Sequence, residues 1–121
     1  MARLHAPELE DYAWFPPRLR DALTGFLGVA TRVLALERAV GPIVQEAFER
    51  TGVRRVVDLC SGAGGPALAL TEHLTAALNA PVELVLTDKY PNLPAFARAR
   101  EQSPATVKAL TESIDACDVP R

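Results

Sequence analysis

A glycine-rich turn directly follows a short apolar stretch, and together they have the residue types of a nucleotide-binding loop. Residues 56–58 read as a strand, and Pro66 suits the first turn of a following helix. Because glycine has no Cβ, Gly62 and Gly64 can take positive φ and let a ligand approach the N–H groups at the helix N-terminus. We therefore expect both glycines to contact a ligand, and Gly65 to serve the turn and the packing of helix on strand.

Two aspartates end apolar stretches, which points to roles in binding. Asp58 ends the first stretch, where a carboxylate costs solvation unless it accepts local N–H groups or meets a cationic group of a ligand. Asp88 ends the second stretch, roughly 20 residues past the glycines, where a carboxylate can accept hydrogen bonds from both ribose hydroxyls of a nucleotide. The alternative for Asp88 is an N-cap or turn acid, because residues 89–92 have the composition of a loop.

The segment Asp58-Leu59-Cys60-Ser61-Gly62-Ala63-Gly64 resembles the first motif of class I S-adenosylmethionine-dependent methyltransferases. The resemblance implies that Asp58 lies near the methionine part of the cofactor, partly through water, and that the backbone from Cys60 through Ser61 to Gly64 passes alongside it. Cys60 stands where many members carry glycine. Residues 62–67 also fit the G-x-G-x-x-A form of the dinucleotide fingerprint. Asp58 with Cys60 and Ser61 favours the methyltransferase, because a dinucleotide fold needs no acid just before its glycines.

The segment Ile114-Asp115-Ala116-Cys117-Asp118 looks like a later motif of the same family. The resemblance implies that Asp115 and Ala116 hold the adenine amino group and ring edge, while Asp118 belongs to the following turn. The alternative is that these acids only solvate the end of the chain. With Lys89 counted beside Asp88, the expected cofactor site then lies at the carboxyl ends of three adjacent parallel strands, where open α/β sheets bind ligands.

Helices and strands alternate in the order that an α/β fold requires. Apolar spacing predicts a helix after Pro17, a break at Gly41-Pro42, and a second helix ending at Thr51-Gly52. Strands at about 56–58 and 81–88 alternate with helices at about 66–78 and 92–102. Residues 107–114 are ambiguous, and we favour a short third strand at 113–116. The prediction is a Rossmann-like parallel sheet of about three strands, preceded by two helices.

Two regions follow from this pattern. Residues 1–52 form an irregular aromatic arm and a helical leader, and residues 53–121 form a partial S-adenosylmethionine-binding α/β domain. The arm carries Tyr12, Trp14 and Phe15 after the acids Glu8, Glu10 and Asp11, and it either covers a substrate or pins itself to the core.

Composition excludes several classes of protein. A formal net charge of −2 over 121 residues gives no basic excess for binding nucleic acid. No stretch resembles a signal peptide or a membrane span. Two cysteines without a secretory signal indicate a reduced, cytoplasmic protein. His73 has no partner at ligand spacing, so we assign no metal site.

The expected function is the cofactor-binding part of a methyltransferase with an unidentified methyl acceptor. In complete members of this family the strands that carry catalytic residues come later, so the chain reads as truncated and we assign no catalytic residue. The first strand would then be an open sheet edge, and we expect marginal stability or self-association through it. The alternatives are a non-catalytic interaction module on the same fold and an NAD-binding oxidoreductase fragment.

Overall fold

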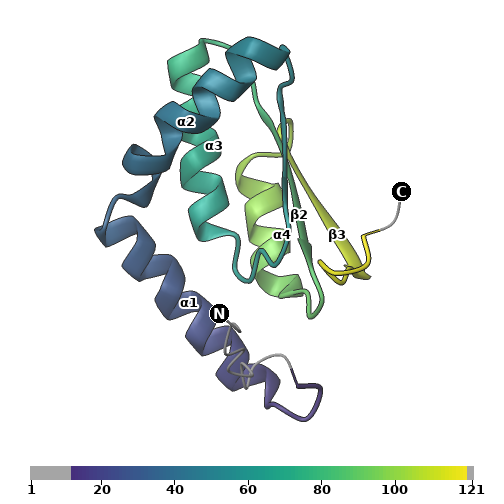
Figure 1. The fold of residues 1–121 in the computed structure, drawn as a ribbon. Coiled ribbons are helices and arrows are strands. Elements are labelled where there is room, and N and C mark those ends of the chain that lie inside the picture. Colours follow the sequence, from purple (N-terminus) through teal and green to yellow (C-terminus); the bar gives the residue numbers. More distant parts are fainter. Residues whose placement is uncertain (1–11, 120–121) are drawn as a thin grey trace, which may run out of the picture.

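The computed structural model describes residues 12–119, except for the side chains of Arg32 and Leu36. The elements follow in the order α1 (Pro17–Val33), α2 (Leu36–Thr51), β1 (Arg55–Asp58), α3 (Gly65–Leu78), β2 (Glu83–Asp88), α4 (Leu93–Gln102) and β3 (Val107–Ser113) (Figure 1). The acids expected in the N-terminal arm, Glu8, Glu10 and Asp11, lie outside the described residues.

The three strands form one parallel sheet in the order β1-β2-β3. Val56 of β1 is level with Leu84 of β2, which is level with Val107 of β3. Each pair of parallel strands is joined by a helix, α3 or α4, as parallel pairing requires. The predicted α/β class, with two helices before a parallel sheet of three strands, is confirmed and is compatible with part of a Rossmann-like fold.

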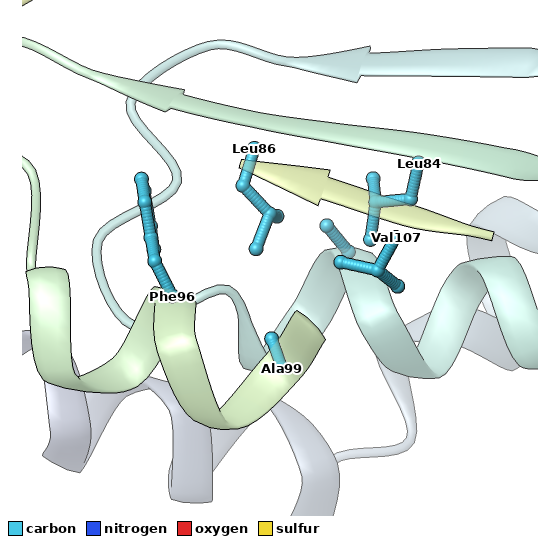
Figure 2. Packing of buried hydrophobic residues seen from close by; sticks show 6 residues of the cluster. Leu84, Leu86, Phe96, Ala99 and Val107 are labelled. Carbon is cyan, nitrogen blue, oxygen red and sulfur yellow. The ribbon is translucent and has the colours of Figure 1, made fainter. Parts of the chain in front are cut away.

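The core lies between one face of the sheet and helices α3 and α4. Leu84, Leu86 and Val107 point from the strands toward Phe96 and Ala99 of α4 (Figure 2), and all five side chains are buried. A second cluster, Phe48, Leu74 and Val82, packs α2 against α3. Burial of these apolar side chains is the main driving force that holds the helices on the sheet.

The opposite face of the sheet is more polar and more exposed. Glu83 of β2 lies between Arg55 of β1, at 2.8 Å, and Lys108 of β3, so an ion-pair chain crosses all three strands. Beside it, Val57 is 53% exposed and Leu110 is also exposed. Parallel sheets are normally buried on both faces, but the apolar side chains Val57 and Leu110 on this face, and β1 at the sheet edge, have no covering partner among the described residues.

The break between the first two helices is not where the sequence predicted it. The chain turns at Ala35, which has φ 49°, and α2 continues through Pro42. Gly41 is buried, and a Cβ there would lie 2.6 Å from Cδ2 of His73 on α3. Glycine is therefore needed for the close approach of α2 to α3, and it does not end a helix. His73 is half-buried in this contact.

The predicted position of the third strand, 113–116, was wrong. Strand β3 covers Val107–Ser113, and Asp115 and Ala116 follow it in a turn. Only Val107 is fully buried, so the alternation of buried and exposed residues along the strand is weak. Pairing with β2 defines the strand instead, from the Leu84 N–H that bonds Thr106 O to the Ile114 N–H that bonds Asp88 O.

No described helix is long and apolar enough to cross a membrane.

Candidate functional site

The loop between β1 and α3 is a tight turn built on left-handed backbone conformations. Cys60, Gly62 and Gly64 have φ of 62°, 54° and 75°. The Gly64 N–H donates to Ser61 O at 2.7 Å, and α3 begins at once with Pro66 in its first turn. Two of the three positions carry glycine, for which this conformation has no steric cost, whereas Cys60 adopts it as a side-chain-bearing residue.

The glycines are also sites of close packing. A Cβ at Gly64 would lie 3.0 Å from Cδ1 of Leu86, and one at Gly62 would lie 3.1 Å from the Thr24 side chain on α1. The nearest atom to a Cβ at Gly65 would be the Gly28 Cα of α1, at 3.6 Å. Gly64 therefore makes the close approach to the sheet that we had expected of Gly65, while Gly65 lies against a helix.

Ser61 joins the loop to the second strand. Its hydroxyl donates to Asp58 O at 2.9 Å and accepts from the Thr87 N–H at 3.0 Å, and its own N–H donates to Thr87 O. The Thr87 hydroxyl also donates to Asp58 O. Both Ser61 and Thr87 are buried, so these bonds extend the β1–β2 pairing into the loop and fix its position.

The Asp88 carboxylate organises the backbone at the ends of both strands. Its Oδ2 accepts the Gly62 N–H at 2.7 Å, and its Oδ1 accepts the Tyr90 N–H at 2.8 Å. The bond to Tyr90 is the turn role that we had considered as the alternative. A carboxylate has about four lone-pair sites, so Asp88 can accept further hydrogen bonds from a ligand in addition to these two.

Asp115 lies close to β2 through an ion pair. Lys89 Nζ is 2.8 Å from Asp115 Oδ2, while the Cys117 N–H donates to Asp115 Oδ1. The Lys89 ammonium, followed by the Cys117 N–H, holds the pKa of Asp115 below its ordinary value. The Ser113 hydroxyl donates to Lys89 O at 2.7 Å and so helps to hold the ends of β2 and β3 together.

These residues meet in one cleft of about 450 Å³ at the carboxyl ends of the strands. Of the expected cofactor residues, six line it: Cys60, Gly62, Asp88, Lys89, Asp115 and Ala116. Ser61 and Gly64 do not line the cleft; the hydrogen bonds of Ser61 and the packing of Gly64 against Leu86 hold the loop in place. The volume lies within the range of about 300–1,000 Å³ typical of small-molecule sites.

Helix α1 supplies a wall of the cleft that sequence reasoning did not anticipate. Arg20, Thr24 and Leu27 line it. The Arg20 guanidinium carbon lies 4.1 Å from the centre of the Tyr90 ring, and Nη2 donates to Tyr12 O. Helical spacing identified α1 but gave no signal for these contacts, because they join segments far apart in the sequence. Within the arm, Phe15 is buried whereas Trp14 is exposed.

Asp58 is not among the residues that line this cleft. Asp58 lines a second cavity of about 260 Å³, formed with residues of α1, α2 and α3. Burial raises the pKa of Asp58, and the negative charge of Asp88 raises it further, while the hydrogen bond from the Ser61 hydroxyl lowers it. The structure thus brings Asp88, Lys89 and Asp115 together in one cleft, whereas Asp58, near enough to Asp88 for their charges to interact, lines the other cavity.

Comparisons of the chain with models of protein families, with curated proteins and with solved structures find no match. Among the described residues, no group of three His, Cys, Asp or Glu side chains lies close enough to hold a metal ion.

Proposed function

We propose that the cleft at the carboxyl ends of the strands binds S-adenosylmethionine and that this chain is the cofactor-binding part of a methyltransferase. The observation that carries the proposal is the position of Asp88, whose carboxylate holds the Gly62 N–H of the glycine loop and faces the same cleft as Asp115. An acid that joins a glycine turn to the end of the second strand suits a ribose with two adjacent hydroxyls.

The chemistry of the cleft fits most of this cofactor. Asp88 retains lone pairs for the ribose hydroxyls, and Ala116 offers an apolar surface for the edge of the adenine. Asp115 can accept from the adenine amino group beside its ion pair with Lys89. Asp58 does not line the cleft, so the proposal assigns it no cofactor contact. When bound, the cofactor would supply an electrophilic methyl group on its sulfonium.

Isothermal titration calorimetry of the purified chain tests the proposal. S-adenosylmethionine and S-adenosylhomocysteine are expected to bind, and NAD is not. Asp88→Asn is expected to weaken binding at least about tenfold, because hydrogen bonds to a charged group contribute roughly 1.5–3 kcal/mol each. Asp118→Asn removes the same charge from the exposed C-terminal turn and should leave the affinity unchanged.

A second variant separates loss of the site from loss of the fold. Asp88 also holds two backbone N–H groups, so Asp88→Asn can disturb the loop itself. Ala116→Phe fills the cleft from an exposed turn residue and leaves those bonds intact. Binding of NAD alone, or undiminished cofactor binding in folded Ala116→Phe, would refute the assignment.

The exposed β1 edge favours a second role, that of an interaction module which self-associates. Val57 of β1 is 53% exposed and Val53, just before the strand, is 51% exposed, and an edge strand with apolar side chains is a template for pairing with another chain. Light scattering after size exclusion should then show a dimer that Val57→Lys converts to a monomer. A monomer at all concentrations of the unaltered chain would contradict this role.

A cytoplasmic location is also part of the proposal, because Cys60 and Cys117 are both exposed thiols, and such thiols stay reduced in that compartment.

A further inference from the structure

The cavity beside Asp58 is a second place where a ligand would fit, and it is separate from the cleft of the proposed cofactor. It has a volume of about 260 Å³ and lies where the first turns of α3 meet α1, α2 and the end of β1. This is slightly below the range of about 300–1,000 Å³ that holds drug-sized ligands, so the cavity suits a smaller organic molecule.

Most of the cavity wall is apolar. Val40 of α2 and four residues at the start of α3, namely Pro66, Ala67, Ala69 and Leu70, supply it. An apolar wall of this kind favours a ligand with a hydrocarbon body, because burying that body removes apolar surface from water.

The polar side chains among the described lining residues are all acceptors. They are Asp58 of β1, Glu37 of α2 and Thr31 of α1. The Thr31 hydroxyl hydrogen is already donated to Gly28 O at 3.0 Å, so only its lone pairs remain for a ligand. Two carboxylates and one accepting hydroxyl, with no cationic side chain among the described residues that line the cavity, would repel an anion and attract a cation.

Asp58 itself has no cationic partner in the part of the chain that the structure describes. None of the described side chains forms an ion pair with it, although it is half-buried. A carboxylate in this position is costly to ionise, and burial accordingly raises its pKa. A ligand cation would offset that cost.

We propose that this cavity binds a small primary ammonium ion with an apolar body. A primary ammonium has three N–H donors, enough to give one to each of the three acceptor side chains, Thr31, Glu37 and Asp58. The hydrocarbon body then lies against Val40 and Leu70. The site does not depend on the methyltransferase proposal, since no cofactor is needed to fill it.

The test compares two probes of nearly equal shape, cyclohexylammonium and cyclohexanol, by amide chemical-shift titration of the ¹⁵N-labelled chain. Cyclohexylammonium is expected to shift the amides of Thr31 and of Ala67 to Leu70, and cyclohexanol is expected to bind at least about tenfold more weakly. Equal binding of the two probes, or no saturable binding of cyclohexylammonium, would overturn the proposal.

Three variants assign the binding to this cavity. Asp58→Asn is expected to weaken cyclohexylammonium binding about tenfold or more, and Ala69→Leu to abolish it by filling the cavity while both acids remain. Glu49→Gln is the matched control, because it removes one exposed negative charge from the same helix as Glu37 but outside the cavity. Loss of binding in Glu49→Gln as large as in Asp58→Asn, or unchanged binding in folded Ala69→Leu, would show that the cation is attracted only by the general surface charge.

Discussion

Gly64→Ala is the substitution whose cost is most directly set by the geometry of the loop. At φ 75° an L-residue has a conformational cost of roughly 1–2 kcal/mol relative to glycine. The new methyl group would lie 3.0 Å from Cδ1 and 3.3 Å from Cδ2 of Leu86, which is fully buried. Displacing a packed core side chain costs roughly 1–3 kcal/mol, so the expected loss of unfolding free energy is about 2–5 kcal/mol.

Gly52→Ala isolates the backbone part of that cost. Gly52 has φ 71°, close to that of Gly64, but apart from its own chain neighbours no described atom lies within 4 Å of the position of its missing Cβ. Urea unfolding of both variants, followed by tryptophan fluorescence or circular dichroism, should show Gly64→Ala to be the less stable by about 1–3 kcal/mol.

Equal losses in the two glycine variants would refute the packing argument and leave only backbone strain. A further check is a double-mutant cycle with Leu86→Val, which shortens the side chain that the new methyl group meets. If the contact with Leu86 is the cause, Gly64→Ala costs less in the Leu86→Val background than in the unaltered protein.

Three other substitutions test the site and the core. Cys60→Gly should raise the unfolding free energy by about 1 kcal/mol in urea titrations, because Cys60 has φ 62°, and an unchanged midpoint would contradict strain there. Burial raises the pKa of Asp58 above 3.8, so the folded protein holds this proton more tightly than the unfolded chain does, and the ionised form weakens the fold at neutral pH. Asp58→Asn is therefore expected to raise the melting temperature at neutral pH. This gain in melting temperature should shrink as the pH falls through the raised pKa toward 3.8. If scanning fluorimetry shows the same gain at every pH, the ionisation of Asp58 is not its cause. Phe96→Ala removes a side chain that is 1% exposed and should lower the free energy of unfolding by about 3–5 kcal/mol, seen as a lower urea midpoint. A loss of unfolding free energy under about 1 kcal/mol would mean that the contact of α4 with the sheet is not part of the core.

Local chemistry was sufficient to predict the parts of the fold that depend on near neighbours in the sequence. The apolar run that ends at Asp88 became β2, and Asn92 caps α4 by accepting the Ala95 N–H, as its type and place predict. The position of β3 was not predictable in the same way. Lys108 and Leu110 lie on the exposed face, so the pattern lacked the clean alternation of a half-buried strand, and pairing with β2 decided the boundaries.

The break between α1 and α2 was also not predictable from the local sequence. Gly41-Pro42 has the composition of a helix stop, yet α2 runs through it because the missing Cβ of Gly41 makes room for the His73 ring. The turn formed instead at Ala35, a residue type with no preference for positive φ. A contact between two helices far apart in the sequence outweighed the local preference of both positions.

The sequence by itself determined the glycine turn, the parallel α/β class and the place of Asp88 at the end of the second strand, because each follows from backbone sterics and short-range apolar patterning. The tertiary structure alone decided that Arg20 and Thr24 of α1 form a wall of the cleft and that Asp58 opens into a different cavity from Asp88. The physical reason is that a cavity is bounded by side chains from several elements. Their packing is set by long-range contacts that no local window of the chain contains.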